Sequence, residues 1–98
     1  MPKEAFIRKK VVEILENNGW ITWYPGKIKF KQNDIFGIID LLALKGRRRK
    51  NIQITTLSNT SDRRKKITSF LKKFKVKMSV EIWSWDKKKK VFKKEKIK

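Results

Sequence analysis

The sequence predicts an α/β domain in which a small mixed sheet is flanked by helices. Two segments, residues 3–18 and 60–74, carry apolar side chains at helical spacing. Between and after them lie short segments rich in β-branched and aromatic residues, which are typical of strands. The expected order is one helix, about three strands, a second helix and one or two further strands. The 98 residues suit a single domain spanning the whole chain.

Each helix is predicted from one apolar stripe and from its end signals. The stripe of the first helix consists of Ile7, Val11, Ile14 and Leu15, and Gly19 is a helix C-terminal signal. The stripe of the second helix consists of Ile67, Phe70, Leu71 and Phe74, and Thr60, Ser61 and Asp62 are its N-cap candidates. Both helices should therefore pack one face against the sheet.

The strands are expected at residues 20–24, 27–31, 35–44, 52–56 and 80–85, with an edge strand near Val91 and Phe92. Residues 27–31 alternate between apolar positions and Lys27, Lys29 and Lys31, so this strand should have a basic, solvated face. Residues 35–44 are apolar at both odd and even positions, as expected of a strand that is covered on both faces. This strand should therefore lie centrally in the sheet. Residues 46–50 should form an exposed basic turn. Residues 93–98 are expected to be a frayed basic tail.

The composition favours a polyanion as the partner. There are 28 Lys and Arg against 9 Asp and Glu, which gives a net charge of +19. Such a charge attracts DNA, RNA or an anionic membrane surface alike. A lysine-rich, cysteine-free surface is also a sign of heat adaptation, although thermophile surfaces usually add glutamate along with lysine. DNA is the expected partner, and RNA is left open.

Missing residue types exclude several classes of site. The chain has no cysteine and no histidine, which excludes disulfides, thiolate or imidazole zinc sites and Ser-His triads. Catalysis must then rest on carboxylates, lysine, tyrosine or a hard metal bound by oxygen. The longest apolar run, residues 35–44, is too short to cross a bilayer, and no signal peptide pattern occurs. We expect a cytoplasmic protein with no membrane partner, in a host cytoplasm if the source is a virus.

Asp40 is the most informative residue, because it directly precedes the apolar run Leu41, Leu42, Ala43 and Leu44. Burying a carboxylate is costly unless it is paired or binds a metal. If the next strand neighbours this one, Gln53 and Thr55 lie beside Asp40. A carboxylate and an amide oxygen can share one hard divalent cation. Asp34 and Glu4 are further candidate ligands, and Gly37 permits a tight backbone path between Asp34 and Asp40.

The segments "GIID", "LLAL" and "IQIT", preceded by the helix that starts near Glu4, resemble the PD-(D/E)XK nuclease superfamily, in the branch of archaeal Holliday-junction resolvases. The resemblance covers about residues 4–85. It implies a restriction-endonuclease-like fold, Mg²⁺ or Mn²⁺ as cofactor and hydrolysis of DNA phosphodiester bonds, with branched DNA as one candidate substrate. It also implies a homodimer.

The resemblance assigns roles residue by residue. Asp40 matches the aspartate that opens a core strand in this family. Gln53 and Thr55 stand where the family has the acid and lysine of its E-x-K tripeptide, so the chain departs at two of three positions. The stretch "DIFGIID" with "IQIT" is similar to a Gln-x-Thr variant of this group, in which Asp34 compensates for the missing acid. Glu4 matches a glutamate that these resolvases often have on the first helix, but it lies about one helical turn before the expected position.

Ordinary structural roles are the alternatives for each candidate. Asp40 could accept backbone hydrogen bonds at a strand start, and Asp34 could form an Asx turn. Gln53 and Thr55 could be solvent-facing strand residues, and Glu4 could complement the helix dipole. Packing is the expected role of the aromatic residues Trp20, Trp23, Tyr24, Trp83 and Trp85, although an exposed ring could stack on an unpaired base.

Two basic runs and one strand face are the expected phosphate contacts. They consist of Arg47, Arg48, Arg49 and Lys50, of Arg63, Arg64, Lys65 and Lys66, and of Lys27, Lys29 and Lys31. All are expected to be solvated. Two functions follow: a metal-dependent DNA endonuclease, or a nuclease-fold nucleic-acid-binding module with weak or no activity, which the departures at Gln53 and Thr55 would favour.

Overall fold

The computed structural model of the chain describes residues 3–24 and 38–97. Its elements are α1 (Lys3–Asn17), β1 (Ile21–Trp23), β2 (Leu41–Lys45), β3 (Arg48–Thr56), the 3₁₀ turn η2 (Leu57–Asn59), α2 (Thr60–Lys73), β4 (Val80–Asp86) and β5 (Val91–Ile97). Over the described residues, the α/β class and the order of helices and strands agree with the expectation from the sequence. The strand expected at residues 27–31 lies outside the described residues.

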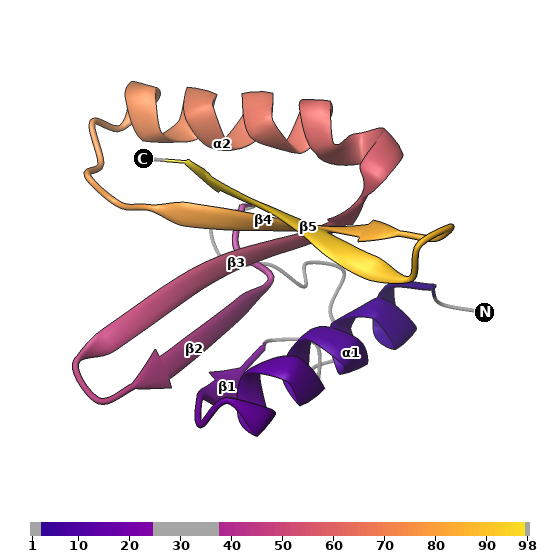
Figure 1. The fold of residues 1–98 in the computed structure, drawn as a ribbon. Coiled ribbons are helices and arrows are strands. Elements are labelled where there is room, and N and C mark those ends of the chain that lie inside the picture. Colours follow the sequence, from indigo (N-terminus) through magenta and orange to yellow (C-terminus); the bar gives the residue numbers. More distant parts are fainter. Residues whose placement is uncertain (1–2, 25–37, 98) are drawn as a thin grey trace.

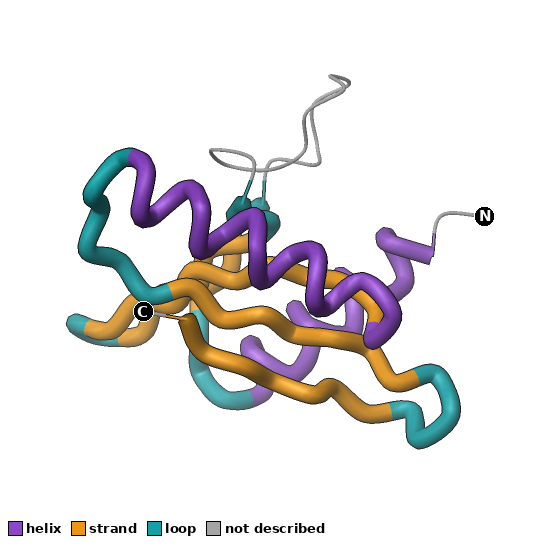
Figure 2. Tube along the Cα trace, turned by 90° about the horizontal axis from the view of Figure 1, so that it is seen from above, coloured by secondary structure: helices purple, strands orange, loops and turns teal. Residues whose placement is uncertain are grey.

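The five described strands form one mixed sheet in the order β1-β2-β3-β4-β5. β1, β2 and β3 are successively antiparallel, β3 and β4 are parallel, and β5 is antiparallel to β4. Since parallel neighbours need a crossover, α2 connects β3 to β4 over one face of the sheet. Figure 1 shows α2 on this face and α1 on the opposite one. Figure 2 shows the same layering from above, with α2 lying over the strands.

One half of the core lies between α1 and the sheet. Ile7, Val11 and Leu15 are buried on α1, and Val11 and Leu15 pack with Leu41 and Ile52 of the sheet. Ile14, expected in the same stripe, is 36 % exposed. The buried positions follow the spacing i, i+4 and i+8, so the sheet contacts a narrower strip of the helix than the sequence pattern suggests.

The other half of the core lies between α2 and the sheet. Ile67 and Leu71 of α2 pack against Val80 and Ile82 of β4. Phe74, expected in this stripe, is 56 % exposed because it forms the C-cap of α2 and lies beyond the sheet contact. The N-cap is Asn59, not one of the predicted candidates. Thr60 is already helical, because its hydroxyl is bonded to Thr56 O and Ser84 Oγ at 3.2 and 2.6 Å.

The turn between β2 and β3 is shorter than the sequence predicts. Pairing continues to Lys45 and Arg48, so only Gly46 and Arg47 form the loop. Gly46 has φ +60°, which fits the first loop position of a tight hairpin turn. Arg48, Arg49 and Lys50 were expected in the turn but belong to β3, because ladder hydrogen bonds involve the backbone and tolerate charged side chains on a solvated face.

Replacing Gly46 with alanine is expected to lower the free energy of unfolding by about 1 kcal/mol. The new Cβ would meet nothing within 4 Å, so the whole loss comes from the positive φ. Urea unfolding of the parent and Gly46→Ala measures the difference. Gly46→Asn should lose less, because asparagine tolerates this conformation better. Equal stability of all three proteins would contradict this account of the turn.

The C-terminal segment is a strand where a frayed tail was expected. β5 pairs with β4 along its full length, from the pair Asp86 and Val91 to the pair Val80 and Ile97. Three side chains anchor it: Phe92 packs on Trp85 with ring centroids 5.0 Å apart, Glu95 pairs with Arg64, and Ile97 packs against the α2 side of the core. The lysine content predicted fraying, but the three anchors are interspersed among the lysines.

Candidate metal centre

Asp40 lies at the point where the β2–β3 ladder ends. Leu41 and Ile52 form its last pair, and Asp40 N donates a hydrogen bond to Ile52 O at 2.8 Å. Ile54 lies two residues further along β3, beyond the reach of a backbone partner on β2. Its N–H is satisfied instead by Asp40 Oδ2, at 2.8 Å. The backbone-acceptor role that was an alternative for Asp40 is therefore confirmed, and it fixes the carboxylate at the strand end.

Gln53 lies beside Asp40, as the sequence predicts for neighbouring strands. Its Nε2 donates to Asp40 Oδ2 at 2.5 Å. The residue is only 2 % exposed, so the alternative of a solvent-facing side chain is wrong. Gln53 is buried because it is opposite Ile82 in β4, on the face of the sheet that α2 covers.

The Gln53 side chain carries a buried oxygen without a partner. Among the described residues, Oε1 of Gln53 is the buried side-chain polar atom that makes no hydrogen bond. Leaving such an acceptor unsatisfied costs about 1–3 kcal/mol. The same amide group touches the Asp40 carboxylate through its nitrogen. A polar ligand at this place would therefore relieve a penalty that the fold already carries.

The donor set fits a hard divalent cation. A carboxylate and an amide oxygen are the ligand types that Mg²⁺ and Mn²⁺ accept, with water completing the coordination. A half-turn of the Gln53 amide would place Oε1 against Asp40 Oδ2, and two acceptor oxygens so close need a shared cation or proton. In the absence of a cation, the amide nitrogen supplies that contact. A single carboxylate gives weaker binding than a pair of carboxylates would.

Thr55 is also buried, at 7 % exposure, so the alternative of a solvent-facing strand residue is wrong for it as well. It is opposite Ser84 in β4, whose hydroxyl is bonded to Thr60 at the start of α2. The contacts of α2 and β4 with this face explain the burial. A threonine supplies a hydroxyl and no positive charge, so the position lacks the ammonium of the E-x-K pattern.

Two candidate ligands fall outside what the structure describes. Asp34 lies in the undescribed segment, and the side chain of Glu4 is likewise not described, although its backbone belongs to α1. Within residues 3–24 and 38–97, no group of three or more acidic side chains is placed to hold a metal ion. Of the four predicted metal ligands, the structure therefore brings together Asp40 and Gln53.

In comparisons with known proteins, no family model, curated protein or solved structure matches this chain. The assignment of the site therefore depends on its geometry alone. Separately, none of the described helices is long and apolar enough to span a bilayer.

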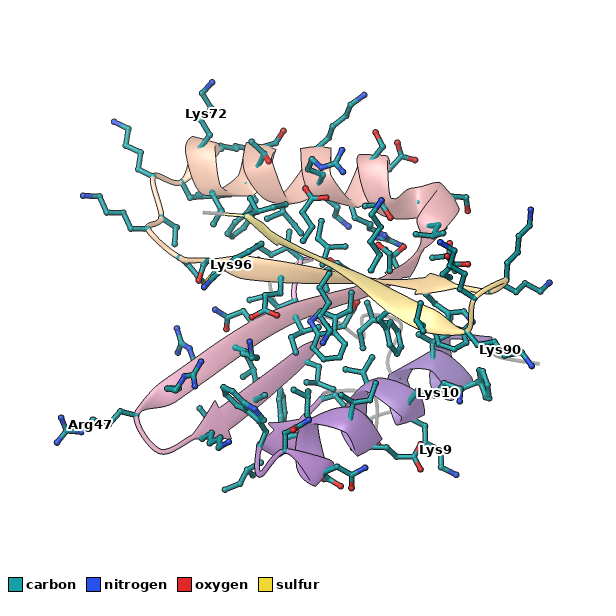
Figure 3. All side chains as sticks on the ribbon, viewed as in Figure 1. Lys9, Lys10, Arg47, Lys72, Lys90 and Lys96 are labelled. Atoms are coloured by element: carbon teal, nitrogen blue, oxygen red, sulfur yellow. The ribbon has the colours of Figure 1, made fainter. Side chains whose placement is uncertain are left out.

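The first basic run lies on the β2–β3 hairpin and has two kinds of members. Arg47, Arg48 and Arg49 are exposed, and Figure 3 shows Arg47 pointing outward from the tip of the hairpin. Lys50 is half-buried and forms an ion pair with Glu81, with Nζ 2.6 Å from Oε2. The expectation that the whole run is solvated is wrong for Lys50, because β3 carries it against β4.

The second basic run lies on α2, where Lys65 and Lys66 are exposed and Arg63 is half-buried. The Arg64 guanidinium forms a two-point contact with Glu95 of β5 and is engaged through Nε and Nη2. Lys27, Lys29 and Lys31 lie outside the described residues. The exposed cations of the two runs are available for phosphate contacts, whereas Lys50 and Arg64 already have carboxylate partners.

Sequence reasoning missed Glu81, an acid with apolar neighbours on both sides in β4. Burial acts to raise the pKa of Glu81, but hydrogen bonds from Lys50 and Trp83 and the charges of Lys50 and Lys96 outweigh it, so its pKa lies below the usual value. Lys50 also lies over the Trp20 ring, 5.3 Å from its centroid. An isolated acid in an apolar run was the available signal for such a pair.

Glu81→Gln is expected to lower the free energy of unfolding by about 1 kcal/mol at neutral pH. Because the pKa of Glu81 is lowered on folding, its contribution is present above the unfolded pKa, near 4.5, and is lost as pH falls through the folded value. The parent and the variant should therefore converge in strongly acidic solution. Urea unfolding as a function of pH measures this, and a constant difference down to pH about 2 would contradict it.

Proposed function

We propose that this protein is a metal-dependent nuclease that hydrolyses phosphodiester bonds in DNA, with Mg²⁺ or Mn²⁺ held at Asp40 and Gln53. The observation that carries the proposal is the unpartnered, buried Oε1 of Gln53, on the same amide that contacts the Asp40 carboxylate. The mixed sheet between two helices is compatible with a restriction-endonuclease-like fold, which is part of the proposal.

The residues of the chain prepare this site in three ways. The Ile54 N–H holds the Asp40 carboxylate in one orientation before any ligand binds. The Gln53 side chain is almost fully buried, which strengthens electrostatic interactions there. The buried Thr55 hydroxyl can donate or accept one hydrogen bond. A divalent cation bound there would activate water and neutralise charge on the phosphate.

Binding of the DNA backbone is assigned to the exposed cations. Arg47, Arg48 and Arg49 lie on the hairpin that also carries Gln53, and Lys65 and Lys66 lie on the helix that covers the same face. Contacts of this kind position the duplex without reading its sequence. Affinity should therefore fall steeply as salt is added.

A binding module without catalysis is the second candidate function, and Thr55 is the observation that favours it. A threonine at this place cannot supply the cation that would orient water or stabilise the pentavalent phosphate. The site also has one carboxylate among the described residues, which weakens metal binding. The charged surface would bind DNA equally well in either case.

One assay separates the two functions. Purified protein is incubated with linear duplex, single-stranded and four-way junction DNA, with Mg²⁺ or Mn²⁺ titrated in and with EDTA as control. The nuclease predicts products that appear only with metal, on at least one substrate. Salt-sensitive binding to all three substrates with no product at any metal concentration would overturn the nuclease and support the binding module.

A further inference from the structure

A groove of about 890 Å³ lies at the carboxyl ends of the parallel strands β3 and β4. Its walls come from the N-terminal half of α1, the η2 turn and the β4–β5 turn, and they include Phe6, Leu57 and Trp85. The volume falls in the range of small-ligand sites. Carboxyl ends of parallel strands are where open α/β sheets commonly bind ligands.

Two aromatic rings, together with Ile7 and Leu57, form the apolar part of the groove. Phe6 is 56 % exposed, although it lies on a helix whose other large apolar residues mostly face the core. Its ring meets that of Trp85 edge to face, with centroids 6.3 Å apart and an interplanar angle of 81°. Trp85 also packs against Phe92, with ring centroids 5.0 Å apart. The indole is thus a fixed, partly open surface on which a flat ring can stack.

The rim of the groove is strongly positive. Lys10 lies over both rings, 4.9 Å from the centroid of Phe6 and 5.5 Å from that of Trp85. The β4–β5 turn adds the consecutive lysines Lys87, Lys88, Lys89 and Lys90. Figure 3 shows Lys10 and Lys90 at the end of the molecule opposite to Arg47, so this cationic site is separate from the β2–β3 hairpin.

Among the described residues, one acid lines the groove, and its carboxylate is used by the β4–β5 turn itself. Asp86 Oδ1 accepts hydrogen bonds from Lys88 N and Lys89 N, at 3.0 and 3.1 Å. The carboxylate therefore holds the turn in shape and faces its backbone. Five lysines around two aromatic rings complement a ligand that joins a flat ring to negative charges.

We propose that this groove binds an unpaired nucleotide of single-stranded DNA, with the base against Trp85 and Phe6 and the flanking phosphates against Lys10 and the Lys87–Lys90 turn. A paired base is enclosed in its stack, so the groove selects single strands, ends and junctions over intact duplex. Thr56 lines the groove and lies three residues beyond Gln53 in β3, about 10 Å along the strand. Gln53 faces α2, whereas the groove lies on the α1 side of the sheet, so the two sites are separate and binding in the groove does not depend on hydrolysis at the metal site.

The test compares two short single strands of about six nucleotides that have the same number of phosphates, one oligothymidylate and one abasic. Binding to the intact protein is measured by fluorescence anisotropy in EDTA at low salt. The parent should bind oligothymidylate about tenfold more tightly than the abasic strand, which is the usual effect of one stacked base. Equal affinity for the two strands would overturn the proposal without any substitution.

Substitutions of aromatic residues then test whether the bound base stacks in this groove. Trp85→Ala should bind oligothymidylate only as tightly as the parent binds the abasic strand, whereas Trp23→Ala, at a 54 % exposed tryptophan on β1, should bind like the parent. Because Trp85 also packs on Phe92, Phe6→Ala serves as a milder second variant, with an expected loss of about threefold. Equal losses for Trp23→Ala and Trp85→Ala would overturn the assignment to this groove.

Matched charge variants test the rim. Lys88→Ala with Lys89→Ala should weaken binding of either strand and flatten its salt dependence, and Lys72→Ala with Lys73→Ala, which removes the same charge on α2, should do so less. Equal effects of the two pairs would contradict the phosphate contacts. Asp40→Asn should keep the preference for oligothymidylate, so failure of the proposed nuclease activity and failure of the groove are distinguishable.

Discussion

Asp40→Asn is expected to reduce metal-dependent DNA cleavage at least about a hundredfold, while leaving the fold and DNA affinity nearly unchanged. Asparagine has the same shape, and its side-chain oxygen can still accept the hydrogen bond from Ile54 N. It lacks the negative charge that the proposed cation needs. The rate of product formation at saturating Mn²⁺, together with the midpoint of thermal unfolding, separates loss of chemistry from loss of structure.

Asp62→Asn is the matched control for this experiment. Asp62 is exposed in the first turn of α2, so the substitution changes the net charge by the same amount at a place with no proposed ligand. Its cleavage rate should stay within about twofold of the parent rate, because surface substitutions are usually nearly neutral. Equal cleavage by Asp40→Asn and the parent would remove Asp40 from the mechanism.

Gln53→Glu is expected to make the stability of the protein strongly dependent on metal. The glutamate would place a carboxylate oxygen where the Gln53 nitrogen is 2.5 Å from Asp40 Oδ2. Two buried like charges repel, so without metal the free energy of unfolding should fall by about 2–4 kcal/mol. For a chain of this size that corresponds to a melting temperature lower by roughly 8–30 °C. Added Mg²⁺ should restore at least half of the loss.

Gln53→Met is the control for the glutamate variant. Methionine has a similar volume and no oxygen ligand, so its melting temperature should not respond to Mg²⁺. Thermal unfolding of parent, Gln53→Glu and Gln53→Met, each with EDTA and with Mg²⁺, gives the comparison. A melting temperature of Gln53→Glu that does not change with metal would mean that the two oxygens do not share a cation.

The sequence predicts the fold well where side-chain periodicity decides it. Val11 and Leu15 on α1 and Ile67 and Leu71 on α2 are buried as expected, because a helix of this kind needs the sheet to cover its apolar face. The extent of β3 and β5 was underestimated at Arg48 and at residues 93–97. Strand pairing in these segments depends on backbone hydrogen bonds and on a few anchoring side chains such as Phe92. The many lysines and arginines around them made the segments look like loops in the sequence.

The sequence predicts which residues of the candidate site lie close together, but it does not predict the contacts that they make. Neighbouring antiparallel strands joined by a short turn bring Asp40 and Gln53 together, which periodicity and chain order suffice to predict. The burial of Gln53 and Thr55 depends on α2 crossing above them, and the pairing of Lys50 with Glu81 depends on the register of a parallel strand 31 residues further on. Both are tertiary facts that no local pattern encodes.

The most direct test of the metal site uses the side-chain amide of Gln53 as a reporter. Substoichiometric Mn²⁺ is added to ¹⁵N-labelled protein, and paramagnetic broadening of each side-chain amide resonance is measured, with Asp40→Asn as the comparison. The account predicts that the Gln53 resonance broadens first in the parent and is unaffected in Asp40→Asn. Broadening that spares Gln53, or that is the same in both proteins, would contradict a cation held between these two residues.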